Sequence, residues 1–151
     1  METDFKAAEV KLIYKNKVKA SERLKIYNST DVYKLLINNF YDKDTIEYRE
    51  SFKVILVNQA NKVLGVTTIS EGGISETIAD IRIILQAAIL SNASGIILSH
   101  NHPSGNLTPS EEDKRLIQRV NEAAIIMRIK LLDHLIITSK GYLSFVDEGL
   151  I

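Results

Sequence analysis

Hydrophobic and polar positions alternate along this chain with two different periods, and together they predict a mixture of helices and strands. After a polar start at Ser29, apolar side chains recur at the spacing of one helical face. A second stretch with helical spacing runs from about Ile78 to Ser91. A third begins near Pro109, where apolar residues again recur at helical spacing downstream. Three helices are therefore predicted.

Short apolar runs bounded by turn-forming residues predict the strands of a sheet. Two of these runs flank the polar turn of residues 58–61, and Gly72-Gly73 follows the second of them. The predicted strands are, in chain order, Val10–Tyr14, Phe52–Val57, Val63–Ser70, Ile96–Leu98, Ile129–Leu132, Leu135–Thr138 and Tyr142–Phe145. Because strands and helices are interspersed along the chain, we predict an α/β sandwich with a mixed sheet.

Length and composition exclude several classes of protein and of metal site. The 151 residues are enough for one domain with a substantial core. The 19 basic and 19 acidic side chains cancel, whereas proteins that live on nucleic acid usually carry a basic excess. There is no cysteine, which excludes disulfides and thiolate metal sites. No apolar run approaches the ~20 residues that cross a bilayer, and the N-terminus lacks the apolar core of a signal peptide. We therefore expect a cytoplasmic protein with no membrane partner.

Candidate chemistry gathers at the end of one predicted strand. His100 and His102 follow the apolar run Gly95–Ser99, and in a strand residues i and i+2 point to the same side. Asp113 follows after a turn. Two imidazoles and a carboxylate, with room for water, form the ligand set of a catalytic zinc site. The sequence therefore predicts a metal-dependent hydrolase.

The start of the third helix explains how the carboxylate could reach the metal. Thr108 is the expected N-cap, Pro109 fits the first helical position, and Glu111 completes a capping box with Thr108. Ser110 and Asp113 are then three residues apart on one helical face. The Ser110 hydroxyl is expected to point toward the cavity that the Asp113 carboxylate enters.

Each of these elements also has a simpler explanation, and other metal enzymes use some of them. A lone His-x-His pair often only satisfies a loop, and Asp113 alone would be a surface acid. The order of strand, turn and helix favours the metal site over those explanations.

Zinc deaminases share a related layered fold but need a Cys-x-x-Cys pair. Barrels that use His-x-His need ~250 residues, and a His-Glu-x-x-His helix is absent from this sequence.

The motif resembles that of a known superfamily. His100–Gly105, followed by Pro109-Ser110 and then Asp113, is similar to the signature of the JAMM (JAB/MPN-type) metalloproteases. Ser99–Gly105 together with Asp133–Ile137 resembles, more narrowly, its RadC-like branch. The similarity is strongest from Tyr48 to Gly149.

The resemblance implies a fold and a division of the chain. We expect a single-domain JAMM/MPN-like α/β sandwich, related to the cytidine-deaminase fold, as the catalytic domain over residues 26–151. A basic N-terminal extension would cover residues 1–25.

The resemblance also implies a mechanism. JAMM enzymes carry a glutamate, upstream of the histidines, that transfers protons for the zinc-bound water. The matching residue is Glu50, with Glu47 as its competitor, and either could be a surface acid at the start of a strand. Zn2+ held by the three ligands would activate water, and Glu50 would carry a proton to the leaving amine. Ser110 would donate a hydrogen bond to the oxyanion. The expected partner is a peptide or isopeptide-linked protein substrate, and no oligomeric state is predicted.

Other features leave alternatives open. An alternative to the hydrolase is a catalytically silent RadC-like module, which would bind protein or DNA in DNA repair or mobile-element biology. Lysines crowd the N-terminal stretch, where a solvated face beside an edge strand is favoured over nucleic-acid contact. RadC-like proteins often carry an upstream helix-hairpin-helix module, but no glycine precedes Gly65. Their His-Pro-Arg-Glu stretch is represented here by Asp80–Ile83, in which only the arginine persists.

Three residues near the motif have less specific roles. Asn101 and Ser104 are interpreted as loop residues that could orient the ligands. For His134, a structural role is favoured over a contact with the site or the substrate.

Overall fold

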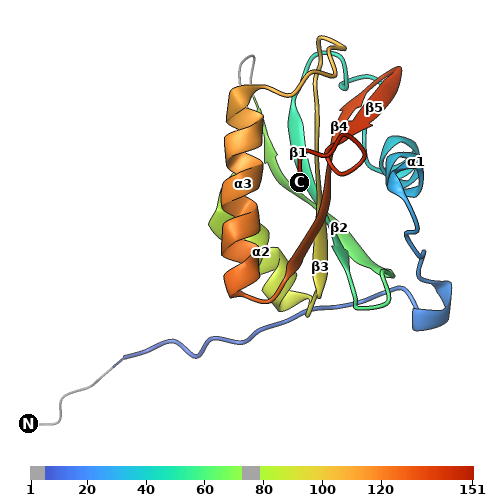
Figure 1. Cartoon of the computed structure of the whole chain (residues 1–151). Coiled ribbons are helices and arrows are strands. Elements are labelled where there is room, and N and C mark those ends of the chain that lie inside the picture. Colours follow the sequence, from blue (N-terminus) through green and yellow to red (C-terminus); the bar gives the residue numbers. More distant parts are fainter. Residues whose placement is uncertain (1–5, 73–78) are drawn as a thin grey trace, which may run out of the picture.

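One mixed sheet with helices on both faces forms the body of the protein (Figure 1). The computed structural model describes residues 6–72 and 79–151. The five strands lie in the order β2-β1-β3-β4-β5; β3 and β4 pair in parallel, and the other neighbours are antiparallel. The elements are η1 (Ala20–Glu22), α1 (Ser29–Asn39), β1 (Ser51–Val57), β2 (Val63–Glu71), α2 (Ile81–Leu90), β3 (Gly95–Asn101), α3 (Glu111–Ile126), β4 (Lys130–Thr138) and β5 (Gly141–Ser144). The predicted α/β sandwich with a mixed sheet is confirmed.

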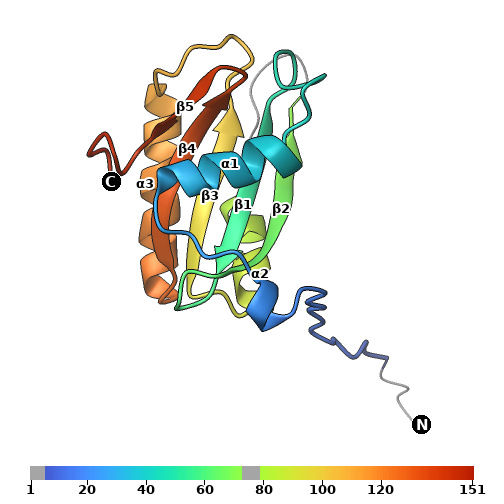
Figure 2. The same cartoon turned by 90° about the vertical axis from the view of Figure 1, so that its right-hand side faces the viewer.

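The helices divide the protein into two cores. Helix α1 crosses one face of the sheet, and α2 and α3 cover the other (Figures 1 and 2). Strands β1 and β3 are buried along their whole length, so their alternating side chains enter the two cores in turn. Leu98 packs with the α2 and α3 core, and Ile97 packs with the α1 core. By the same alternation His100 faces α2 and α3, and Ser99 faces α1.

The N-terminal stretch differs from the prediction. Val10–Tyr14 was expected to form a strand, but residues 6–17 adopt no helix or strand. Val10 is 82% exposed, and the Tyr14 hydroxyl donates to the Leu64 carbonyl. Alternating apolar and lysine side chains are typical of a strand. A strand also needs a second strand that pairs with its backbone N–H and C=O groups. In the described part of the chain no strand pairs with this segment. The predicted strand is therefore wrong.

The remaining boundaries shift only slightly. The helix from Ser29 and the strand pair around residues 58–61 are confirmed. The two strands predicted at Ile129–Leu132 and Leu135–Thr138 are one strand, β4, because the polar pair between them stays within the ladder. The second helix begins at Ile81, capped by Asp80; the predicted start at Ile78 lies outside the described residues. Among the described helices, none has the length and apolar character of a membrane span.

Candidate metal centre

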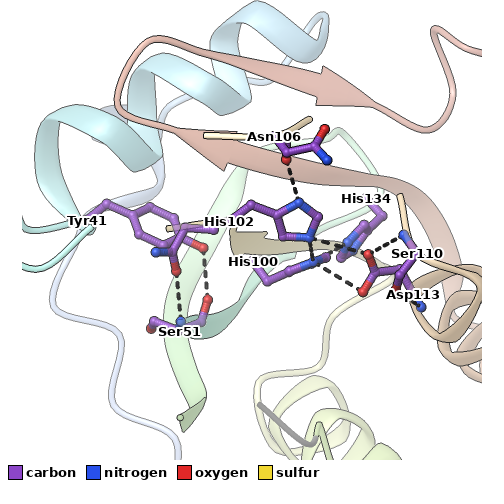
Figure 3. Close-up of polar contacts among 9 residues, drawn as sticks. Tyr41, Ser51, His100, His102, Asn106, Ser110, Asp113 and His134 are labelled. Atoms are coloured by element: carbon purple, nitrogen blue, oxygen red, sulfur yellow. Dashed lines mark hydrogen bonds and ion pairs between the residues drawn. The ribbon is translucent and has the colours of Figure 1, made fainter. Parts of the chain in front are cut away.

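Three side chains from two elements converge at one end of the sheet. His100 lies in β3, His102 follows directly after that strand, and Asp113 lies in the first turn of α3. The Nε2 atoms of His100 and His102 are 2.9 Å apart. Asp113 Oδ1 lies 3.3 Å from His100 Nε2, and Asp113 Oδ2 lies 3.4 Å from His102 Nε2. Figure 3 shows the two rings and the carboxylate pointing toward one another. The structure thus brings together the three residues predicted as ligands.

The spacing of these atoms fits a small divalent cation. Four ligand atoms placed tetrahedrally at the usual ~2.0–2.1 Å from zinc are separated by about 3.3 Å. The observed separations of 2.9 to 3.4 Å are close to that value. Two imidazole nitrogens and one carboxylate also suit zinc and leave a position for water. The trio can therefore hold a metal ion.

Hydrogen bonds behind the rings direct the nitrogen lone pairs. His102 Nδ1 donates to the Asn106 carbonyl oxygen at 2.6 Å, because a carbonyl can only accept. The proton of a neutral His102 ring is therefore on Nδ1, which leaves the Nε2 lone pair facing the centre. On the other ring, His100 Nδ1 lies 2.7 Å from Nε2 of His134. Both ligand rings are thus held from behind.

Helix α3 begins two residues later than predicted. Its N-cap is Ser110, whose Oγ accepts from the Asp113 backbone N–H at 3.0 Å. In return Asp113 Oδ2 accepts from the Ser110 backbone N–H at 2.9 Å. The predicted box of Thr108 and Glu111 is wrong, since the same residue pattern recurs two positions later and aspartate serves in place of glutamate. The capping box fixes the Asp113 carboxylate, so one side chain both caps the helix and faces the histidines.

The charges of the trio favour a cation at its centre. Burial raises the pKa of Asp113, but hydrogen bonds to His100 and His102 outweigh it and hold that pKa well below its usual range. The hydrogen bond to Asp113 raises the pKa of His102, against the opposing effect of burial. An ionised carboxylate that attracts a proton between these rings attracts a metal ion for the same electrostatic reason.

Glu50 lies at the start of the strand that pairs with the strand of the ligands. Glu50 immediately precedes β1, and two residues later Phe52 pairs with His100 across the β1–β3 ladder. Residues i and i+2 of a strand share a face, so strand alternation, extended one residue before the first residue of β1, indicates the side of the trio for position 50. Its charge contributes to the raised pKa of His102. Its backbone carbonyl accepts from the Gly72 N–H at 2.8 Å, which ties this position to the end of β2.

The competitor Glu47 lies in a different place. Its Oε1 accepts from the Ser139 hydroxyl at 2.8 Å. It lines an open cavity of about 310 Å³ beside the trio, together with His102, Pro103, Ser104, Gly105, Thr138, Ser139 and Lys140. Glu47 therefore stands at the mouth of the site, whereas Glu50 stands at the end of a strand that pairs with the strand of the ligands. The proton-transfer role of Glu50 stays a prediction.

Four polar residues around the trio have clear positions. Ser110 is exposed at the helix N-cap, and accepting one hydrogen bond leaves its hydroxyl proton available for donation. Ser104 is an exposed loop residue whose Oγ accepts from the Asn106 N–H at 3.3 Å. Asn101 is fully buried in β3 rather than in a loop. The hydrogen bond between His102 and the Asn106 carbonyl was not predicted, because every residue has a backbone carbonyl and the sequence does not mark which one accepts.

Comparisons with known proteins agree with this geometry. A family model described as the RadC-like JAB domain matches residues 26–150. A UPF0758 protein of Porphyromonas gingivalis is 50% identical over 104 residues, which cover 68% of this chain and 46% of that protein. A UPF0758 protein of Flavobacterium johnsoniae is 46% identical over 101 residues, covering 67% and 44%. One from Thermotoga maritima is 38% identical over 125 residues, covering 83% and 54%. The chain spans about half the length of these curated relatives.

Proposed function

We propose, from the premise that this chain belongs to the RadC-like JAB domain family, that it is a zinc-dependent hydrolase of the JAMM type acting on peptide or isopeptide bonds. The observation that carries the proposal is the convergence of His100 Nε2, His102 Nε2 and the Asp113 carboxylate within 3.4 Å of one another. Two imidazole nitrogens and one carboxylate thus offer ligand atoms to a single metal ion.

The trio would hold the metal, and the residues around it would carry the proton and the developing charge. Zinc bound there would supply a water of near-neutral pKa and polarise the substrate carbonyl. Glu50 is suited to accept a proton from the attacking water and deliver it to the leaving nitrogen, since its charge acts on His102. The Ser110 hydroxyl is suited to donate to the carbonyl oxygen as negative charge develops on it.

The cavity beside His102 supports a peptide substrate. Its lining is mainly polar and includes Glu47, Ser139 and Lys140, and the cavity is open to solvent. An extended peptide needs hydrogen-bond donors and acceptors along an accessible groove, whereas a small apolar ligand needs an enclosed apolar pocket. This lining favours the peptide.

The test is a screen of peptides and isopeptide-linked conjugates with the zinc-loaded protein and its Glu50→Gln variant. We expect one class of bond to be cleaved by the wild type, and turnover to fall about 100- to 10,000-fold in Glu50→Gln while zinc remains bound. Equal turnover in the two proteins would assign proton transfer to another group. If the protein binds no zinc when supplied with it, the proposal is wrong.

A second candidate function is a catalytically silent module that contacts nucleic acid. It is supported by the N-terminal stretch, whose lysines are exposed on an extended segment leading away from the sheet (Figure 1). Phosphate contacts made by lysines weaken steeply with salt. Salt-sensitive binding of an oligonucleotide by a protein that cleaves nothing in the screen would favour this alternative.

A further inference from the structure

His134 lies directly behind His100, on the side of the ring that faces away from the trio. It is completely buried in β4, and Leu98 pairs with it across the parallel β3–β4 ladder. Its Nε2 lies 2.7 Å from His100 Nδ1. Two aromatic rings enclose it: Phe52 is stacked at 5.8 Å between centroids, and Phe145 lies edge-on at 4.9 Å. The polar His134 ring is therefore packed between two apolar aromatic side chains.

The surroundings of His134 argue against a purely structural role. Its other nitrogen, Nδ1, is buried and has no hydrogen-bond partner among the described residues. A structural histidine in a core is expected to satisfy both nitrogens, because an unpaired buried polar atom is destabilising. Within the described chain the His134 ring makes one hydrogen bond, and that bond is to His100. Phenylalanine or leucine would fill the same space without an unpaired atom.

We propose that His134 is a positioning residue that holds His100 in the tautomer able to bind metal. With a neutral His134 accepting at Nε2, the His100 proton stays on Nδ1 and the Nε2 lone pair is directed at the centre. His134 then carries its own proton on Nδ1, so it accepts from His100 rather than donates. This inference rests on the proposed function only in requiring that the trio bind metal.

The choice of a neutral acceptor has a consequence for the charge of the centre. Ligand histidines commonly donate to a carboxylate or a carbonyl. Here a carboxylate is adjacent in sequence, but Asp133 is turned away and accepts from the Ser144 hydroxyl and the His134 and Val146 N–H groups. Asp113 is thus left as the charged ligand of the trio, so a bound dication would keep net positive charge, which lowers the pKa of a bound water.

Three substitutions separate positioning from packing. In His134→Gln the side-chain amide reaches the place of Nε2 and can still accept from His100. In His134→Asn it reaches only the place of Nδ1, and His134→Phe keeps the aromatic volume without an acceptor. We expect zinc affinity, measured by competition with a chelator, to fall about 10- to 100-fold in His134→Asn and His134→Phe. His134→Gln should stay within a few-fold of the wild type.

A measurement on the wild type keeps the test independent of whether each variant folds. Ring 15N shifts of the zinc-loaded protein should show His100 protonated at Nδ1 and His134 unprotonated at Nε2. A proton found on His134 Nε2 in the loaded protein overturns the inference. Equal affinity losses in all three variants, or no loss in any, also overturn it while leaving the proposed function standing. Failure of the wild type to bind zinc would overturn both.

Discussion

The two faces of the sheet carry polar side chains from the same strands, yet among the described residues only one face carries a group that could hold a metal ion. On the α2 and α3 face, His100 contacts both Asp113 and His134. On the α1 face, an equally buried cluster is formed by Tyr41, Ser51, Lys53, Ser99 and Asn101. Along β3 the two sets alternate residue by residue, so they share the same backbone and depth.

On the α1 face the polar groups mostly satisfy one another. The Tyr41 hydroxyl lies 2.9 Å from Ser99 Oγ and 3.2 Å from the Ser51 carbonyl oxygen. Asn101 accepts from the Ser51 N–H and donates to the carbonyls of Ile46 and Arg49. The Ser51 hydroxyl is an exception, since it is buried without a partner in the described part of the chain. One such atom cannot form a ligand set.

Burial and polarity alone therefore do not identify a site. Donors and acceptors that pair with each other hold segments together, as Asn101 holds residues 46–51, which include Glu50. A site is indicated where possible metal-binding atoms of separate segments face one central point at ligand spacing, as the Nε2 atoms of His100 and His102 and the Asp113 carboxylate do. Substitutions on the α2 and α3 face should therefore affect metal binding, and substitutions on the α1 face should affect stability.

The largest effect is expected from removing a ligand. His100→Ala or Asp113→Ala should abolish the binding of about one zinc ion per chain, because two remaining ligands cannot hold the metal at micromolar concentration. Tyr41→Phe is the matched control, since it removes a buried polar atom from the other face. Elemental analysis of the dialysed proteins should show zinc in the wild type and in Tyr41→Phe only. Zinc retained by the alanine variants would place the metal elsewhere.

The second effect should appear in stability rather than in metal content. Asn101→Ala leaves the Ser51 N–H and the carbonyls of Ile46 and Arg49 without their partner. We expect the free energy of unfolding to fall by about 2–4 kcal/mol in urea titrations of the metal-free protein. Zinc affinity of the folded fraction should change little. A large loss of zinc affinity at unchanged stability would show that the two faces are not separate.

The residues of the metal trio were predictable from the sequence, whereas the polar cluster on the α1 face was not, because it depends on contacts between distant segments. The His-x-His pair and the downstream aspartate follow from local periodicity, as does the burial of β1 and β3. The link between His134 and His100 depends on β3 and β4 being parallel neighbours, which no local pattern encodes. Val10–Tyr14 failed as a strand for the same reason, since pairing is not local. The start of α3 was misplaced because two capping patterns overlap, and local sequence does not choose between them.

A third and smaller effect is expected at the N-cap of α3. Ser110→Ala removes the oxygen that accepts from the Asp113 N–H, and loss of an N-cap costs about 1 kcal/mol of stability. Zinc affinity should fall only modestly, because the backbone N–H of Ser110 still binds Asp113 Oδ2. Thermal unfolding of Ser110→Ala and of Ser110→Thr, which keeps a capping hydroxyl, measures the difference. A loss of turnover in zinc-loaded Ser110→Ala much larger than its loss of stability, with turnover kept in Ser110→Thr, would support an oxyanion role for the hydroxyl.

The smallest effect is a pH dependence on the α1 face. Lys53 is buried in β1, where its ammonium donates to Thr68 Oγ1 at 2.9 Å and lies 5.0 Å from the Tyr41 ring centroid. Burial lowers its pKa, although the charge of Glu71 partly opposes this. Because the unfolded chain then binds the proton more tightly, the wild type should gain stability as pH rises from the folded pKa toward ~10.4. Below the folded pKa both states are charged, and this contribution is constant.

Urea unfolding between about pH 8 and pH 9 measures this gain about one pH unit below the ordinary tyrosine pKa of ~10. Lys53→Met keeps the length of the side chain but cannot titrate, so relative to it the wild type should gain free energy of unfolding across the window. Lys34→Met, at an exposed position of α1, should follow the wild type. Parallel stability curves for wild type and Lys53→Met would mean that the ammonium keeps its hydration on folding. The α1 face would then be open to water at β1, and its contrast with the metal face would rest on Asn101 and Tyr41 alone.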